Sequence, residues 1–270
     1  MEIQLKISFI KSGNLQIVAV GDGAPTSRFC FSFLFAFIFE PRFDCVYADF
    51  MLKYLRMNKK TATEVASRLL EEYPNAKPAL KFNSSYELLV AVILSAQCTD
   101  ERVNKVTEKL FAVANTPQDM INLGVENLEK YIFSCGLYRS KATHIISLSE
   151  RLVKDYGGEV PPTLKELSTL DGVGRKTANV VYSVAFGGNA IAVDTHVFRV
   201  SARIGLANGK TPTETEKILM KKIPEEMWSR LHHALIYHGR RVCVARSPKC
   251  EECVIRELCE KNGVKDRNKV

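Results

Sequence analysis

The most informative stretch of the chain reads Leu170-Asp171-Gly172-Val173-Gly174-Arg175-Lys176-Thr177-Ala178-Asn179-Val180-Val181. A short helix is predicted before it, over residues 163–168, and Lys-Thr-Ala-Asn-Val-Val begins a second helix. The Gly-x-Gly between them predicts a tight hairpin, because glycine adopts positive φ and leaves neighbouring amides uncovered. Amides at such a turn, beside a helix N-terminus, are able to bind a phosphate. The stretch therefore predicts a helix–hairpin–helix, a clamp for the DNA backbone that does not depend on base sequence.

An ordinary corner between two helices, with a solvated lysine, is the alternative interpretation. A bare Gly-x-Gly favours that corner, whereas the flanking apolar residues and the run 174–178 favour the clamp. A nucleotide-binding P-loop is excluded, because the longer spacer between its two glycines is missing.

Lys176 lies at the mouth of the hairpin, on the first turn of the second predicted helix. A lysine is unfavourable there with respect to the helix dipole, so the position invites a functional explanation. We expect it to be partly buried in a positive field, which favours the neutral amine and makes it available as a nucleophile.

Asp194 follows the apolar run 191–193 and precedes another predicted helix. Aspartate is a common helix N-cap, and spacing alone favours that role. A capping carboxylate is also able to face a pocket, so a second role is compatible with the first. His196 fits equally well as a packed polar residue or as part of that pocket.

Four of the eight cysteines lie close together near the C-terminus, at Cys243, Cys250, Cys253 and Cys259. No cleavable signal sequence opens the chain, so we expect a reducing compartment, where clustered thiols favour a metal over disulfides. Zinc is usually bound by two separated Cys-x-x-Cys pairs, and only Cys250 and Cys253 have that spacing. The compact series therefore predicts a 4Fe-4S cluster, with zinc as the alternative.

Length and charge set wide bounds. The 270 residues suffice for one large domain or two modest ones, and the 46% of hydrophobic residues suffice for a core. The formal net charge of +8 suits a polyanion such as nucleic acid, although a basic protein of another function fits equally well.

Residues 1–56 differ in composition from the rest. Phenylalanine alternates at every second position from Phe29 to Phe39, which predicts a strand. The apolar run ends before Pro41 and is too short for a membrane-spanning helix, which needs ~20 residues. We expect this segment to lie outside the working fold, as upstream sequence translated from an early start codon. A short arm that binds a membrane surface or a partner is the alternative.

Residues 57–270 carry helix signals and almost no strand pattern, so we expect an all-α fold there. Two capping boxes are predicted at Ser84 with Glu87 and at Thr163 with Glu166. Two further helix starts are predicted where a threonine cap precedes proline, at residues 116–117 and 211–212.

The hairpin, the Lys176–Asp194 pair and the four cysteines together resemble the endonuclease III family, the iron–sulfur branch of the helix–hairpin–helix DNA glycosylase superfamily. The resemblance runs from about Met57 to the C-terminus. It implies a two-domain all-α fold with DNA bound across a cleft. Residues 78–188 then form a six-helix barrel domain that ends with the hairpin, and residues 57–77 plus 189–270 form the cluster domain.

The resemblance also implies residue roles. Lys176 matches the family's catalytic nucleophile, Asp194 its catalytic carboxylate, and the four clustered cysteines its cluster ligands. Gln97 matches the residue that fills the gap left by a flipped base, and Leu137 matches the wedge that inserts into the base stack. The remaining candidates are Gly172, Gly174 and Arg175 for DNA binding, and Ser95 and His196 for the pocket. One departure is Asp171, which stands where proline is usual and brings an acid close to the clamp.

The expected function is that of a bifunctional DNA N-glycosylase and AP lyase of base excision repair. It would remove oxidised or damaged pyrimidines and cleave 3′ to the abasic site through a lysine Schiff base. The expected partner is duplex DNA with damaged bases or abasic sites. We expect a monomer without membrane contact, in the cytoplasm or, in a prokaryote, at the nucleoid.

Three alternatives remain. A mismatch-specific adenine or thymine/uracil glycosylase shares the hairpin and cluster, although Lys176 argues against the adenine enzyme. A non-catalytic DNA-binding iron–sulfur protein needs no Lys176–Asp194 pair. A redox protein needs only the cluster.

Overall fold

The computed structural model describes residues 4–9, 15–20, 28–31 and 57–264. The chain divides into two compact units, residues 1–56 and residues 57–270, and each is described by itself. Within the described residues, no helix is long and apolar enough to cross a membrane.

The first unit contains a three-stranded antiparallel sheet in the order β1-β2-β3. Its strands are β1 (Gln4–Phe9), β2 (Leu15–Val20) and β3 (Arg28–Phe31). Ile17 of β2 lies opposite Ile7 of β1 and Phe29 of β3. The predicted strand is thus confirmed over β3, whereas the rest of the phenylalanine series lies outside the described residues.

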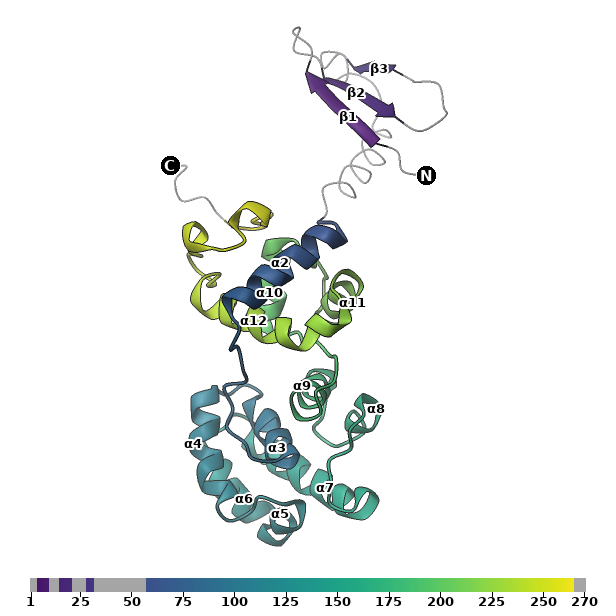
Figure 1. Ribbon diagram of the computed structural model, residues 1–270. Helices are drawn as coiled ribbons and strands as arrows, with labels where there is room; N and C mark the ends of the chain where they lie inside the picture. The colour runs from purple at the N-terminus through teal and green to yellow at the C-terminus, as the bar shows by residue number, and fades with distance from the viewer. Residues whose placement is uncertain (1–3, 10–14, 21–27, 32–56, 265–270) are drawn as a thin grey trace, which may run out of the picture. The chain divides into compact units, whose positions relative to one another are not determined.

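All elements within residues 57–264 are helical, so the all-α class is confirmed for the described part of this unit (Figure 1). The α-helices are α2 (Lys59–Glu72), α3 (Ser85–Ser95), α4 (Asp100–Phe111), α5 (Pro117–Leu123), α6 (Val125–Ile132), α7 (Tyr138–Tyr156), α8 (Leu164–Leu167), α9 (Arg175–Ala185), α10 (Thr195–Ile204), α11 (Pro212–Lys222) and α12 (Trp228–Arg241). Short 3-10 helices are η1 (Glu225–Met227), η2 (Cys250–Glu252) and η3 (Arg256–Leu258).

The predicted helix starts are confirmed. The hydroxyl of Ser84 accepts a hydrogen bond from the amide of Glu87 at the start of α3, and Thr163 does the same for Glu166 at the start of α8. Thr116 and Thr211 cap α5 and α11, each directly before a proline. These caps satisfy amides that the first helical turn leaves without partners, so short polar signals set the helix bounds.

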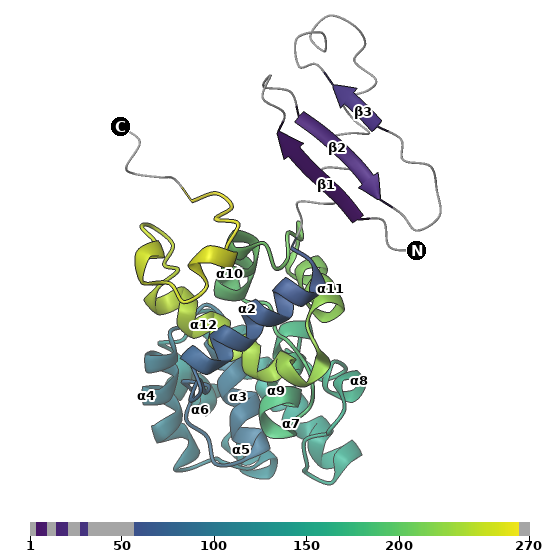
Figure 2. The same cartoon turned by 45° about the horizontal axis from the view of Figure 1, so that its top comes forward.

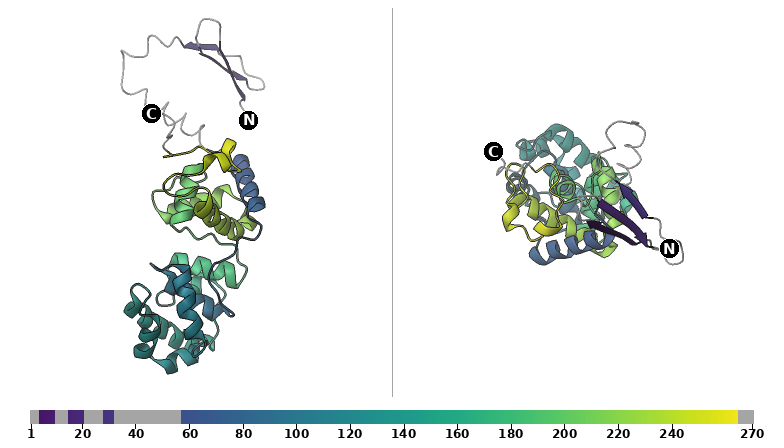
Figure 3. Two further views of the ribbon diagram at one scale, coloured as in Figure 1. Left: turned by 90° about the vertical axis from the view of Figure 1, so that its left-hand side faces the viewer. Right: turned by 90° about the horizontal axis from the view of Figure 1, so that it is seen from above.

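Two separate hydrophobic cores hold the helical unit together. The first core runs from Tyr86 to Val181 and is formed by helices α3 to α9. The second core joins two distant segments, residues 57–73 on α2 and its approach, and residues 191–255. Figure 1 and the left panel of Figure 3 show the corresponding helices as two groups, α3–α7 in blue to teal and α10–α12 in green to yellow.

Helix α2 completes the second core although it precedes the first core in the chain. Its apolar face buries Ala62, Val65, Ala66 and Leu69 completely. Figure 2 shows α2 lying across α12, whose Leu231 and Leu235 are also fully buried. The chain therefore leaves the second core after α2, builds the first core, and returns to the second.

Candidate active site

The hairpin between α8 and α9 has the predicted form. Gly172 has φ 74°, and a Cβ at this position would lie only 2.9 Å from Cβ of His144, so both the conformation and the close approach require glycine. Gly174 is the N-cap of α9 and has no side-chain cap hydrogen bond. The first amides of α9 therefore point out of the turn without a side chain across them, as a phosphate site requires.

Asp171, the departure from the family pattern, is held by α7. The hydroxyl of Ser147 donates a hydrogen bond to the Asp171 carboxylate. This contact fixes the acid beside the hairpin and gives it a structural partner on the barrel helices.

Lys176 and Asp194 line the same small cavity, which measures about 110 Å³. Ser95, at the end of α3, lies on its wall as well. Lys176 comes from the first turn of α9, and Asp194 from the N-cap of α10. The cavity therefore brings together three of the predicted site residues from three different helices.

Asp194 has the predicted capping role, because its Oδ1 accepts a hydrogen bond from the amide of Val197 at 2.8 Å. The expected partial burial of Lys176 is wrong, because its side chain is exposed. Residues 174–176 are all exposed, so the turn that starts α9 leaves the amine open to solvent. The amine is accessible to a substrate, and its activation cannot come from burial in the protein alone.

Helix α12 contributes lining residues that the sequence analysis did not predict, including His232, His233 and Arg240. His232 is 3% exposed, and its Nδ1 lies 2.7 Å from the carbonyl oxygen of Ala192. Burial, and then the neighbouring His232, lower the pKa of His233 to about 3, so this ring stays neutral near pH 7. The two adjacent histidines in the sequence of α12 were the signal that could have found them.

An ion pair connects α12 to the start of α4 beside this cavity. Nη2 of Arg240 lies 2.8 Å from Oδ2 of Asp100, and both residues line the cavity. It links a helix of the second core to a helix of the first.

Arg175, a predicted DNA contact, has a protein partner. Its guanidinium pairs with the buried carboxylate of Glu216 on α11, which also accepts a hydrogen bond from Asn179. The side chain of Arg175 remains 56% exposed, so one edge of the guanidinium is open while the other joins α9 to α11.

His196, a predicted pocket residue, is not among the residues that line the cavity. Its Nδ1 lies 3.3 Å from Nη2 of Arg199, which also donates to the carbonyl oxygen of Gly239 at 2.9 Å. Burial is the main cause that lowers its pKa. The structure places His196 in the packing between α10 and α12.

Gln97 and Leu137 share an uncommon backbone conformation. Both lie in the left-handed region, with φ 55° and 58°, and both are exposed. Gly136 lies between them, because a Cβ on this residue would sit 3.1 Å from the carbonyl oxygen of Gln97. The two predicted DNA-inserting residues are therefore neighbours in space.

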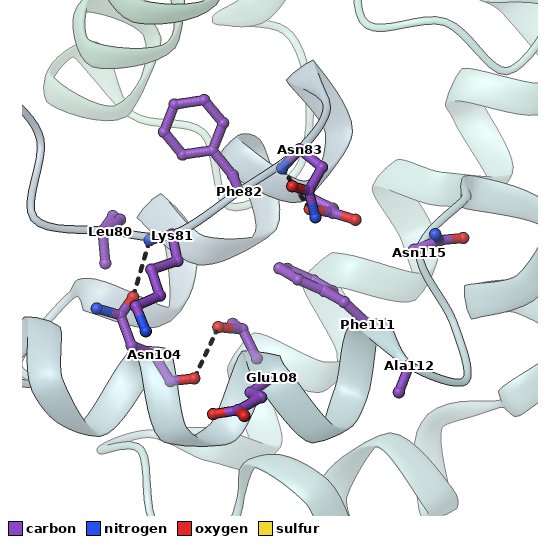
Figure 4. A pocket seen from close by; sticks show the side chains of 11 residues that line it. Leu80, Lys81, Phe82, Asn83, Asn104, Glu108, Phe111, Ala112 and Asn115 are labelled. Atoms are coloured by element: carbon purple, nitrogen blue, oxygen red, sulfur yellow. Dashed lines mark hydrogen bonds between the residues drawn. The ribbon is translucent and has the colours of Figure 1, made fainter.

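A larger cavity, about 660 Å³, opens between α3, α4 and the segment before α3 (Figure 4). Two of its polar side chains are bonded within the protein: Oδ1 of Asn104 accepts from the amide of Lys81, and Glu87 accepts from the amide of Asn83. None of the predicted site residues lines it.

The four clustered cysteines lie on the loop that follows α12, and all are half-buried. Cys243, Cys253 and Cys259 pack against the second core. Polar groups approach the sulfurs: Nη1 of Arg203 lies 3.8 Å from Sγ of Cys243, and the amide of Lys261 lies 3.4 Å from Sγ of Cys259. Hydrogen bonds to sulfur are a feature of iron–sulfur sites.

His238 of α12 contacts this loop through one of its cysteines. Its Nδ1 lies 3.1 Å from the Tyr73 hydroxyl, and its Nε2 lies 3.6 Å from Sγ of Cys253. Burial lowers the pKa of His238 to about 4, so the ring is neutral and carries one N–H near pH 7. In the tautomer that accepts from the Tyr73 hydroxyl at Nδ1, the ring N–H is at Nε2 and faces the sulfur.

In residues 57–264 and the three strands, no group of three or more His, Cys, Asp or Glu side chains is arranged to hold a single metal ion. A 4Fe-4S cluster requires a different arrangement from that of a single metal ion, because its four thiolate ligands bind four separate irons. An all-sulfur donor set that is half-buried and receives N–H donors fits such a cluster.

Two family models match the chain. The model of the HhH-GPD superfamily base excision DNA repair protein matches residues 90–225, and the model of the iron–sulfur binding domain of endonuclease III matches residues 243–259. The second match begins at Cys243 and ends at Cys259.

Whole-length relatives agree with these models. Endonuclease III of Haemophilus influenzae is 51% identical over 204 residues, which cover 76% of this chain and 97% of the relative. Endonuclease III of Bacillus subtilis is 49% identical over 212 residues, which cover 78% and 97%. The chain belongs to the endonuclease III family.

Solved structures of DNA-bound relatives also match this chain. A trapped endonuclease III–DNA covalent intermediate matches with a TM-score of 0.72 and 49% identity, over 76% of this chain and 97% of that one. A non-covalent endonuclease III–DNA complex matches with the same TM-score and 48% identity, over 76% and 96%.

As a member of this family, the protein is a DNA glycosylase and AP lyase of base excision repair that binds DNA, and its cofactor is a 4Fe-4S cluster. The non-catalytic DNA-binding protein, the redox protein and the zinc site are thereby set aside. The expected fold class is confirmed as well.

Proposed function

We propose that this enzyme excises damaged pyrimidines from duplex DNA with Lys176 as its nucleophile and Asp194 as its catalytic carboxylate. One observation carries the proposal: both side chains, from different helices, line one cavity. An exposed amine at that cavity is able to reach a nucleotide that enters from solution.

In the proposed reaction the Lys176 amine attacks C1′ of the damaged nucleotide, and the bond between C1′ and the base breaks with its electrons leaving on the base. The base takes up a proton, and the sugar ring opens to give a protonated Schiff base between C1′ and Nζ. This positive group acidifies C2′–H, and loss of that proton expels the 3′ phosphate by β-elimination. Asp194 stabilises the positive charge that develops on the sugar, and its bond to the Val197 amide fixes its orientation.

Binding of the duplex is proposed to use the hairpin and the Gln97–Leu137 pair. The uncapped amides after Gly174 bind the backbone phosphate, and the net charge of +8 supports salt-sensitive affinity. Leu137, whose side chain is 62% exposed, inserts into the base stack, and Gln97 fills the gap left by the extruded nucleotide.

The proposed cluster ligands are the thiolates of Cys243, Cys250, Cys253 and Cys259. When bound, the cluster supplies four strong metal–thiolate bonds that fold the loop after α12 onto the second core. His238, Arg203 and the Lys261 amide then donate to the coordinated sulfurs.

We further propose that the two cores are two domains, 78–188 and 57–77 plus 189–270, with DNA between them. The enzyme acts as a monomer on damaged bases or abasic sites, in the cytoplasm and without a membrane partner. Residues 1–56 take no part in catalysis.

Borohydride trapping tests the central assignment. The wild type on a thymine glycol duplex should give a covalent protein–DNA adduct after reduction of the Schiff base. Lys176→Ala should give none, while Lys154→Ala, which removes an exposed lysine from α7, should trap like the wild type. Adduct formation by Lys176→Ala at the wild-type level would show that another amine attacks.

A mismatch-directed activity is the second candidate. A thermostable thymine-DNA glycosylase matches the fold with a TM-score of 0.68 and 25% identity, over 75% of this chain and 96% of that one. Parallel assays on thymine glycol and on T:G and U:G mismatches discriminate the two substrate classes. Faster excision from the mismatches would replace damaged pyrimidines as the proposed substrate.

A further inference from the structure

Lys141, on the first turn of α7, is a buried lysine that the proposed reaction does not use. Its side chain is only 5% exposed. Its Nζ donates hydrogen bonds to the carbonyl oxygens of Leu94 at 2.8 Å and Ala96 at 2.6 Å. Burial of an ammonium group is unfavourable unless polar groups compensate it, and here the two carbonyl oxygens do so. The position of these carbonyls shows what the lysine holds in place.

The two carbonyls belong to the C-terminal end of α3. This helix ends at Ser95, with Ala96 as its C-cap, and the next residue is Gln97 with φ 55°. Carbonyls at a helix end lack intrahelical partners and carry the negative end of the helix dipole. The Lys141 ammonium therefore stabilises the end of α3 immediately before Gln97.

The backbone of Lys141 also contacts Leu137. Its amide donates to the carbonyl oxygen of Leu137 at 3.1 Å, and Leu137 is the left-handed N-cap of α7. Gly136, the residue before Leu137, lies against the carbonyl oxygen of Gln97. One residue is thus bonded to the two loops that carry both left-handed, exposed side chains.

The nearby thiol of Cys135 does not form an ion pair with Lys141. Burial raises the pKa of the nearby Cys135 thiol to about 11, so that thiol is neutral near pH 7. Burial likewise lowers the pKa of Lys141. The carbonyl oxygens of Leu94 and Ala96 accept hydrogen bonds from its Nζ, and such bonds favour the ammonium form. A left-handed conformation is unfavourable for Gln and Leu, so the surrounding structure has to impose it.

We infer that Lys141 is a positioning residue that presets Gln97 and Leu137 together for insertion into the duplex. The inference rests on the proposed roles of those two residues. Lys141 is not among the residues that line the Lys176 cavity, and its proposed role is to hold the two loops in position relative to each other.

The test separates duplex opening from chemistry in the cluster-loaded, full-length enzyme. A 2-aminopurine placed beside thymine glycol reports extrusion of the nucleotide by its fluorescence, and borohydride trapping on a preformed abasic site reports the lysine chemistry. Lys141→Met keeps the length of the side chain and removes its charge. Lys154→Met, on the exposed face of the same helix, is the matched control.

Lys141→Met should slow the fluorescence change at least tenfold while trapping on the abasic site stays within about threefold of the wild type. Lys141→Arg should recover part of the fluorescence rate, because a guanidinium also donates to carbonyls. A wild-type fluorescence rate in Lys141→Met would overturn the inference.

Gly136→Ala is a second test if Lys141→Met does not fold, because a Cβ at position 136 would lie 3.1 Å from the carbonyl oxygen of Gln97, directly after the Ala96 carbonyl that Lys141 binds. It should slow extrusion in the same way, and an unchanged rate would overturn the inference. Gln97→Ala, measured in parallel, tests the underlying role. An unchanged extrusion rate in Gln97→Ala refutes the proposed function of Gln97, whereas a slow Gln97→Ala with a normal Lys141→Met refutes only the inference about Lys141.

Discussion

The carboxylate of Glu216 accepts two hydrogen bonds from the guanidinium of Arg175, from Nε at 2.8 Å and from Nη2 at 2.9 Å. Oε1 also accepts from Nδ2 of Asn179 at 3.0 Å. The Glu216 side chain is 7% exposed, so the pair is covered on its acidic side. A single carboxylate therefore joins the hairpin helix of the first core to α11 at the second.

Glu216→Gln should destabilise the protein, because the amide group presents a donor where Arg175 and Asn179 also donate. We expect the free energy of unfolding to fall by about 1–3 kcal/mol. Urea unfolding followed by circular dichroism measures it, with exposed Glu226→Gln as the control. A difference of less than about 0.5 kcal/mol between the two variants would mean that the carboxylate contributes little.

Asp171→Asn should tighten binding to undamaged duplex DNA. The change removes one negative charge beside the phosphate clamp and retains an acceptor for Ser147. We expect about two- to fivefold higher affinity at low salt and a smaller gain at high salt, because salt screens charges. Fluorescence anisotropy at two salt concentrations measures the change, and Glu71→Gln on α2 serves as the control. Equal affinity at low salt would show that Asp171 is remote from the bound phosphates.

His233 should make stability depend on pH. Its folded pKa is about 3, whereas an unfolded histidine has a pKa of about 6.5. Between these values the unfolded state binds a proton that the folded state does not, so acidification lowers the free energy of unfolding. The slope for one such proton is at most about 1.4 kcal/mol per pH unit.

Urea unfolding at pH 7.5 and 5.5 checks this linkage. The wild type should lose more stability on acidification than His233→Gln, and His144→Gln, which replaces an exposed histidine, should behave like the wild type. Identical losses in the wild type and His233→Gln would place the pH dependence elsewhere.

Loss of a cluster ligand should loosen the second core selectively. Cys253→Ser removes the thiol that faces His238, and the visible absorbance of the cluster should disappear. Amide hydrogen exchange in α10 and α12 should accelerate at least tenfold, while α3 in the first core stays protected. Cys98→Ser, which changes a thiol at the first core, is the control. Equal acceleration in α3 would mean that the two cores unfold as one.

Local chemistry made much of this structure predictable. Gly172, the capping residues and the cysteine series act within a few residues of themselves, so their patterns are visible in the sequence. The exposure of Lys176 was mispredicted because it depends on what covers a helix end. Lys141 and His232 were missed because their partners lie 47 and 40 positions away in the chain, and residue spacing carries no information on such contacts.

The division of the helical unit into two cores also determines the order in which they are able to fold during protein synthesis. Every residue of the first core lies between Tyr86 and Val181, so it is able to form once that continuous stretch has left the ribosome. Helix α2 is made earlier, but its partners in the second core begin at Ile191 and end at Ile255. Helix α2 therefore lacks its complete set of partners until nearly the whole chain has been made. A nascent chain that stalls before α12 carries the first core complete and an α2 with only part of its partners, and it lacks all four of the proposed cluster ligands.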